Sequence, residues 1–176
     1  MARAADYSAN ETLRNGEGIE IRALRPGDRT DLLAAVERTS AQSLYRRFFG
    51  AKRSFSEQEI AFFVNVDFVK HVALVAVPQN GSIVAGGRYV VFEPGRAEVA
   101  FAVIDDYQGR GIGQILLRHL AAIACDAGLV EFTAEVLSGN AAMLKVFEKG
   151  GLPLATKHES GVVHVALQLT RSRADC

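Results

Sequence analysis

The sequence predicts an α/β fold in which helices pack on the faces of one mixed β-sheet. First, its 176 residues are 49% hydrophobic and 23% charged, which is typical of one globular domain with its own core. Second, three consecutive β-rich segments joined by tight turns indicate an antiparallel meander. Third, strand-like and helix-like segments alternate after the meander, as they do where helices cover a sheet.

The charge and hydropathy patterns exclude several classes of protein. The 20 Lys and Arg residues balance the 20 Asp and Glu residues, so no global positive field exists to hold nucleic acid or an anionic membrane. The longest dense apolar run, residues 72–77, is far shorter than the roughly 20 residues that span a bilayer. The polar first residues do not resemble a signal peptide, and two cysteines make no disulfide framework. We therefore expect a cytoplasmic protein without nucleic-acid or membrane partners.

The predicted domain occupies residues 18–170. Residues 1–17 are small, polar and aperiodic, and they predict a flexible N-terminal arm. Residues 171–176 predict a frayed tail. Within the domain, residues 19–24 alternate apolar with polar side chains and predict the first strand.

Helices are expected after this strand. Asp28 is placed to cap the first of them, and a second helical stretch ends near Phe49. Ser56 and Glu59 have the spacing of a capping box, which predicts the start of a third helix.

The meander and the alternating elements follow. Its three strands are expected over residues 71–77, 82–92 and 97–104, and Gln79-Asn80-Gly81 is a hairpin signal. A long amphipathic helix then begins near Gly113 and ends at Gly128. The remaining elements are a strand, a helix and a strand, over residues 130–137, 140–149 and 162–169.

The turn between the last meander strand and the long helix carries three glycines. Gly109, Gly111 and Gly113 remove side chains where the backbone must approach another group closely. The N–H groups in the first turn of a helix are unpaired and carry the positive end of its dipole. With Arg110 beside them, they predict a cradle for a phosphate or pyrophosphate, although close packing of the helix start is the alternative.

Two segments carry a resemblance to a known family. Gln108-Gly109-Arg110-Gly111-Ile112-Gly113 resembles the Gln/Arg-x-x-Gly-x-Gly/Ala pyrophosphate loop of the GNAT superfamily of N-acetyltransferases. Residues 140–152 are similar to the family's Asn-x-x-Ala-x-x-x-Tyr/Phe-x-x-x-Gly-Phe segment. The resemblance implies acetyl-CoA as co-substrate. It also implies the GNAT fold, a single mixed, mostly antiparallel sheet of about seven strands with helices on both faces.

Residues 43–49 and 97–101 resemble the catalytic domain of bacterial protein lysine acetyltransferases, whose targets include acyl-CoA synthetases. This resemblance implies acetyl transfer to a lysine side chain of a protein, by direct attack in a ternary complex. Many relatives add a CoA-ligase-like or nucleotide-sensing domain, for which we expect no room here. Two alternatives remain: an acetyltransferase for a small-molecule amine, and a non-catalytic GNAT domain that senses CoA.

The same resemblance assigns the cofactor-binding residues. These are Phe101, Ala102, Val103, Gln108, Gly109, Arg110, Gly111, Ile112, Gly113, Gln114, Asn140 and Phe147. The backbone of the first three is expected to bind the pantetheine arm as an added strand, with the Val103 N–H stabilising the oxyanion. Asn140 is expected to bind the same arm, and a helix N-cap is a compatible role.

The resemblance makes Glu98 the general base, because an acceptor lysine must lose a proton before it attacks. Glu98 is the one carboxylate on an apolar strand, and we expect it to be partly buried; the alternative is a rim glutamate paired with Arg88 or Arg96. Phe147 departs from the family, which often has a tyrosine there to protonate the leaving thiolate.

The remaining polar residues are less specific. Arg46 and Arg47 predict a solvated helix face, or alternatively a lip that recognises an acidic patch on the target. The four histidines show no metal-ligand spacing, so no metal is expected.

Overall fold

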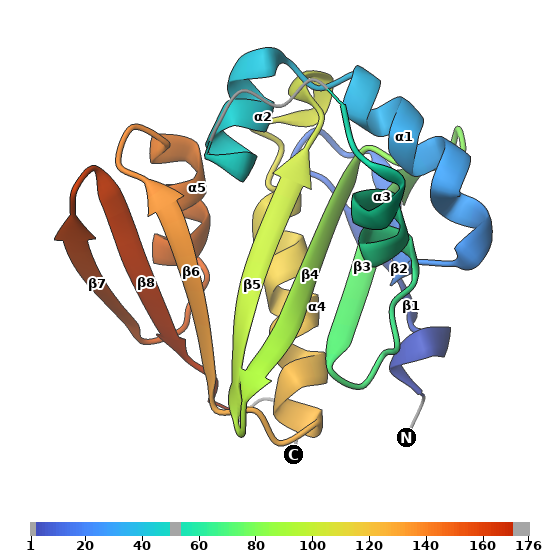
Figure 1. The fold of residues 1–176 in the computed structure, drawn as a ribbon. Coiled ribbons are helices and arrows are strands. Elements are labelled where there is room, and N and C mark those ends of the chain that lie inside the picture. The colour runs from blue at the N-terminus through green and yellow to red at the C-terminus, as the bar shows by residue number, and fades with distance from the viewer. Residues whose placement is uncertain (1–2, 50–53, 171–176) are drawn as a thin grey trace.

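The structure is a computed structural model that describes residues 3–49 and 54–170. Within these residues, eight strands form one open sheet in the order β1-β2-β3-β4-β5-β6-β8-β7 (Figure 1). Their bounds are β1 Ser8–Thr12, β2 Gly18–Ala23, β3 His71–Pro78, β4 Ala85–Glu93, β5 Arg96–Val103, β6 Glu131–Leu137, β7 Leu154–Glu159 and β8 Val162–Gln168. Neighbouring strands are antiparallel except β5 and β6, which are parallel.

Helices cover both faces of the sheet (Figure 1). They are α1 Arg29–Glu37, α2 Ala41–Phe48, α3 Glu57–Val64, α4 Ile112–Asp126 and α5 Ala141–Glu148, with short 3-10 helices η1 Ala4–Asp6, η2 Pro26–Asp28 and η3 Asp105–Tyr107. The helices α4 and α5 contact each other on one face, and α1, α2 and α3 lie over the other. The core lies mainly under α4, where Leu116, Leu120 and Phe132 are fully buried. The predicted α/β architecture, a single mixed and mostly antiparallel sheet with helices on both faces, is thus confirmed, with eight strands rather than about seven.

The prediction of a flexible N-terminal arm over residues 1–17 is wrong where the structure has a strand. Ser8–Thr12 forms the edge strand β1, which pairs antiparallel with β2 from Ser8↔Arg22 to Thr12↔Gly18. An edge strand buries little surface, so its polar sequence shows no apolar alternation. The other edge strand, β7, was missed for the same reason, because five of its residues are exposed. The predicted tail, residues 171–176, lies outside the described residues.

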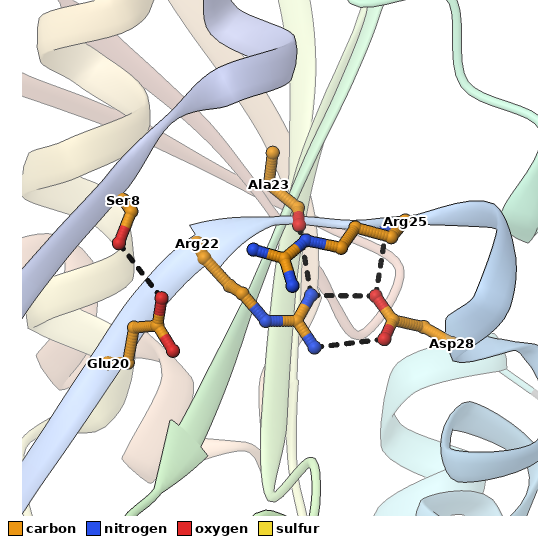
Figure 2. A network of polar contacts seen from close by, with 6 residues as sticks. All are labelled: Ser8, Glu20, Arg22, Ala23, Arg25 and Asp28. Atoms are coloured by element: carbon orange, nitrogen blue, oxygen red, sulfur yellow. Dashed lines mark hydrogen bonds and ion pairs between the residues drawn. The ribbon is translucent and has the colours of Figure 1, made fainter.

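Two of the three expected side-chain caps form as predicted. Ser56 and Glu59 make the reciprocal capping box of α3, and the Asn140 side chain accepts from the Met143 N–H at the start of α5. Asp28 precedes α1 but its side chain does not cap it. Its carboxylate instead binds the Arg22 guanidinium at 2.7 and 2.9 Å and accepts from the Arg25 N–H (Figure 2). Arg22 is only 8% exposed, so its buried charge requires this partner.

The sheet forks between its two parallel strands. Paired residues of β5 and β6 run only from Arg96↔Glu131 to Glu98↔Thr133, and beyond them the strands diverge (Figure 1). On its other side β5 stays paired with β4 as far as Val103. The fork therefore leaves the β6 side of the second half of β5 without a neighbouring strand.

Candidate active site

A cleft of about 850 Å³ follows the fork from the α1–α3 face of the sheet to the starts of α4 and α5. It is lined by Glu98 and by every expected cofactor-binding residue except Arg110. The fold thus brings together segments from β5, the glycine turn and α5 that are distant in the sequence. Arg110 lies elsewhere: its guanidinium donates to Glu17 at 3.1 Å and to the Asp106 carbonyl at 2.9 Å.

The three glycines of the turn have two different roles. Gly109 and Gly111 have φ values of +77° and +88°, a region that side-chain-bearing residues rarely adopt. Gly111 is also the N-cap of α4 and offers no side chain to the free N–H groups of the first turn. Gly113 instead allows close packing, because a Cβ there would lie 2.9 Å from Cγ2 of Val146 in α5. The turn therefore leaves the first N–H groups of α4 without a side-chain cap and also provides a packing contact between α4 and α5.

Arg14 is a candidate binding residue that the sequence reasoning missed. It lies between β1 and β2, lines the cleft, and donates from Nη2 to Oε1 of Gln114 at 3.2 Å. Its Nε would lie 3.2 Å from a Cβ at Gly111, so the guanidinium borders the cradle. The sequence contains a signal for the turn that carries Arg14, because Asn15-Gly16 is a strong hairpin dipeptide. In the structure Gly16 has a φ of +86°.

Glu98 lies where the β5–β6 pairing ends. It is exposed rather than partly buried, although its backbone is still paired with Thr133 of β6. Neither expected ion pair forms: Arg96 pairs with Glu93 and Glu131, and Arg88 donates to the Phe63 carbonyl. The carboxylate therefore lines the cleft, and no arginine of residues 3–49 and 54–170 forms an ion pair with it.

The other expected residues complete the cleft around the end of β5. Gln108 donates from Nε2 to the Val103 carbonyl and to the Ser43 hydroxyl, both at 3.1 Å, which ties the turn to β5 and α2. Phe147 is 2% exposed and packs against Phe101 with ring centroids 6.0 Å apart. Phe147 therefore lines the cleft at the position where the family often has a tyrosine.

Arg46 and Arg47 line the cleft together with Arg88 and are not a solvated helix face. Burial lowers the pKa of Arg47, and the negative charge of Glu98 partly offsets that effect. Burial, and then the charge of Arg47, lowers the pKa of Arg88 to about 10. Because arginine is not deprotonated in proteins at neutral pH, the two guanidinium groups make the α2–α3 side of the cleft positive.

Comparison with protein families agrees with this geometry. Residues 38–152, which include the whole fork and the glycine turn, match the Acetyltransferase (GNAT) family. The chain belongs to this family. It is 34% identical over 154 residues to the acetyltransferase Pat of Mycolicibacterium smegmatis, a match that covers 86% of this chain and 46% of that protein. The chain therefore spans just under half the length of that relative.

Solved structures extend the comparison. The GNAT domain of S. lividans PAT is 36% identical, with a TM-score of 0.86 over 92% of this chain and 97% of that chain. The protein yncA of Salmonella typhimurium was solved with its cofactor acetyl-CoA and shares the fold, with a TM-score of 0.71. It is 19% identical over 90% of this chain and 99% of that chain.

Within residues 3–49 and 54–170, no group of three or more His, Cys, Asp or Glu side chains could hold a metal ion. No helix in the same ranges is long and apolar enough to cross a bilayer.

Proposed function

We propose that this acetyltransferase transfers the acetyl group of acetyl-CoA to a lysine side chain of a protein, with an acyl-CoA synthetase as the candidate acceptor. The observation that carries the proposal is that Glu98 faces the same cleft as the glycine turn. A proton acceptor and an anion cradle for the donor thus share one continuous site. The similarity to Pat and the resemblance of residues 43–49 and 97–101 to protein lysine acetyltransferases support the choice of acceptor.

The residues present fit the diphosphate of CoA. A Cβ at Gly111 would crowd the Arg14 guanidinium, and the α4 N-terminus has no side-chain cap. Free N–H groups, a helix dipole and an arginine are together the chemistry that binds pyrophosphate. Arg14 therefore takes the role that the sequence assigned to Arg110.

The open side of β5 suits the pantetheine arm. Main-chain groups of Phe101, Ala102 and Val103 on the fork side can hydrogen-bond the arm as an added strand. Asn140 and Phe147 line the same cleft. The N–H of Val103 would stabilise negative charge that develops on the thioester oxygen during attack.

Glu98 supplies the proton acceptor in this mechanism. A lysine ammonium has a pKa of about 10.4 and cannot attack until it loses a proton. Glu98 takes that proton directly or through a water, and the amine then attacks the thioester carbonyl. Phe147 has no proton to donate, so the thiolate leaves unassisted or is protonated by water. A thiolate whose conjugate acid has a pKa of about 8.5 can leave in this way.

Replacing Glu98 with glutamine tests the mechanism. We expect Glu98→Gln to lower kcat by about 10²–10⁴, because general-base catalysis is lost. Acetyl-CoA affinity, measured by calorimetry, should stay the same because main-chain groups and the glycine turn hold the donor. Glu135→Gln is the matched control, since Glu135 is an exposed carboxylate of β6 that also lines the cleft. Equal rates for Glu98→Gln and the wild type would remove Glu98 from the mechanism.

The acceptor class is tested with labelled acetyl-CoA and three kinds of acceptor: a folded acyl-CoA synthetase, lysine peptides, and small amines such as polyamines. Label transferred to protein lysine supports the proposal. Transfer confined to small amines would contradict it, and the absence of turnover with every acceptor would favour a domain that senses CoA.

A further inference from the structure

The acceptor side of the cleft holds two arginines whose charges are not neutralised. Arg47 comes from α2 and Arg88 from β4, and both line the cleft. Across residues 3–49 and 54–170, neither guanidinium forms an ion pair with a carboxylate. Each instead packs on a phenylalanine: the Arg47 Cζ lies 4.8 Å from the Phe48 ring centroid, and the Arg88 Cζ lies 4.8 Å from that of Phe63.

Arg88 is held in place by neutral partners. Its Nη1 donates to the Phe63 carbonyl at 3.2 Å and to Nε2 of His71 at 2.9 Å. His71 is 9% exposed and stacks on Phe62 with ring centroids 4.8 Å apart. These contacts position the guanidinium without cancelling its charge. A half-buried cation without a counter-ion is costly, which indicates a site that a substrate anion completes.

The arginine pair lies beside the proposed base. Arg88 is opposite Ala100 in the β4–β5 register, so its side chain shares a sheet face with Glu98, two residues along β5. The charge of Arg47 acts on Arg88, and the charge of Glu98 acts on Arg47, so the three groups form one electrostatic cluster. The glycine turn, by contrast, follows the other end of β5, and the Arg14 side chain borders that turn.

We propose that Arg47 and Arg88 bind a carboxylate of the acceptor, contributed by an aspartate or glutamate side chain that neighbours the acceptor lysine. The inference rests on the proposed function, since it assumes that the lysine amine reaches Glu98. A lysine ammonium alone would enter a site in which two positive charges outweigh one negative charge. An accompanying carboxylate removes that repulsion, and guanidinium groups bind carboxylates with paired hydrogen bonds. A polyamine brings only further positive charge and is disfavoured.

Bisubstrate conjugates test the proposal without requiring turnover. The probes are short peptides whose lysine Nε is joined to CoA through an acetyl bridge, with Asp or Asn at each neighbouring position in turn. Calorimetry on the wild-type chain should show the best Asp conjugate binding at least about tenfold tighter than its Asn partner. In Arg47→Gln and Arg88→Gln, the preference should fall to within about twofold, while the affinity for CoA alone stays the same.

Two further variants keep the result interpretable. Arg88→Lys retains a positive charge and should retain part of the preference, which separates loss of charge from local misfolding. Arg25→Gln removes an exposed arginine outside the cleft and should behave as the wild type.

The outcomes separate this inference from the function on which it rests. Equal binding of Asp and Asn conjugates, with CoA bound normally, would overturn the carboxylate site and leave the proposed function intact. Failure to bind CoA at all would contradict the proposed function itself. A third outcome is that no peptide preference exists, but that the arginine variants, unlike the wild type, bind succinyl-CoA more weakly than acetyl-CoA. That result would assign the arginines to the acyl chain and overturn the proposal.

Discussion

Single residues of the cradle act through contacts that span the chain. Gly111 is required by its own φ of +88°, but its value for binding also depends on Arg14, about 100 positions earlier. The Arg14 guanidinium is exposed, and it is oriented by Gln114 in the first turn of α4. The positive charge of Arg14 therefore acts together with the positive end of the α4 dipole.

The Arg14→Gln variant should bind CoA about tenfold more weakly, because one charge-assisted contact to the diphosphate is lost. Affinity for pantetheine, which lacks the diphosphate, should stay the same. Calorimetry at two salt concentrations checks this, since the wild type should lose more affinity than the variant as salt rises. An unchanged CoA affinity would show that the diphosphate lies away from Arg14.

At the scale of elements, α1 is attached to the sheet by a buried ion pair. Arg22 from β2 and Asp28 from η2 bind each other with both side chains about 10% exposed, and Asp28 also accepts from the Arg25 N–H (Figure 2). The pair fixes the turn from which α1 departs. Residues of α1, including Leu32, Leu33 and Val36, then line the cleft.

Removing the charge of Asp28 should destabilise the fold. Asp28→Asn leaves the buried Arg22 without a counter-ion, which typically costs about 3–5 kcal/mol of unfolding free energy. For a chain of this size, each kcal/mol lowers Tm by about 2–4 °C. Glu57→Gln is the control, because its pair with Arg29 is exposed and should contribute under about 1 kcal/mol. Equal Tm values for the two variants would contradict this account.

At the scale of the whole molecule, buried histidines make the fold sensitive to acid. Burial, and then the charge of Arg88, lowers the pKa of His71 to about 4, although Asp67 acts in the opposite direction. Burial also lowers the pKa of His119, which lies between Tyr7 and Glu11 and joins the N-terminal strand to α4. In both cases the unfolded chain binds a proton more readily than the folded chain.

Stability should therefore fall as the pH drops from about 6.5 towards 4. In that window His71 alone can contribute up to about 1.4 kcal/mol per pH unit, because the unfolded state is protonated first. Urea unfolding at several pH values should show a shallower dependence for His71→Gln than for the wild type. A dependence that is identical in the two proteins would mean that His71 is not the group responsible.

Local chemistry explains what the sequence by itself determined. The glycine turn, the capping box at Ser56, the Asn140 cap and the hairpin at Gly81 depend on backbone angles and hydrogen bonds within a few residues. The patterns were therefore sufficient to predict the order of most elements, the family and the two motifs that line the cleft. The polar edge strands β1 and β7 were not predicted, because they bury too little surface to require an alternation of apolar and polar residues.

The tertiary structure decided which distant charges meet. Arg110 binds Glu17 while Arg14 borders the cradle, and Asp28 binds Arg22 instead of capping α1. Such pairings depend on strand register and burial. A buried charge needs an opposite charge or a hydrogen-bond partner, and the fold decides which group lies near enough to provide it. For the same reason, only the folded chain shows that Arg47 and Arg88 line one cleft and that, within the described part of the chain, neither forms an ion pair with a carboxylate.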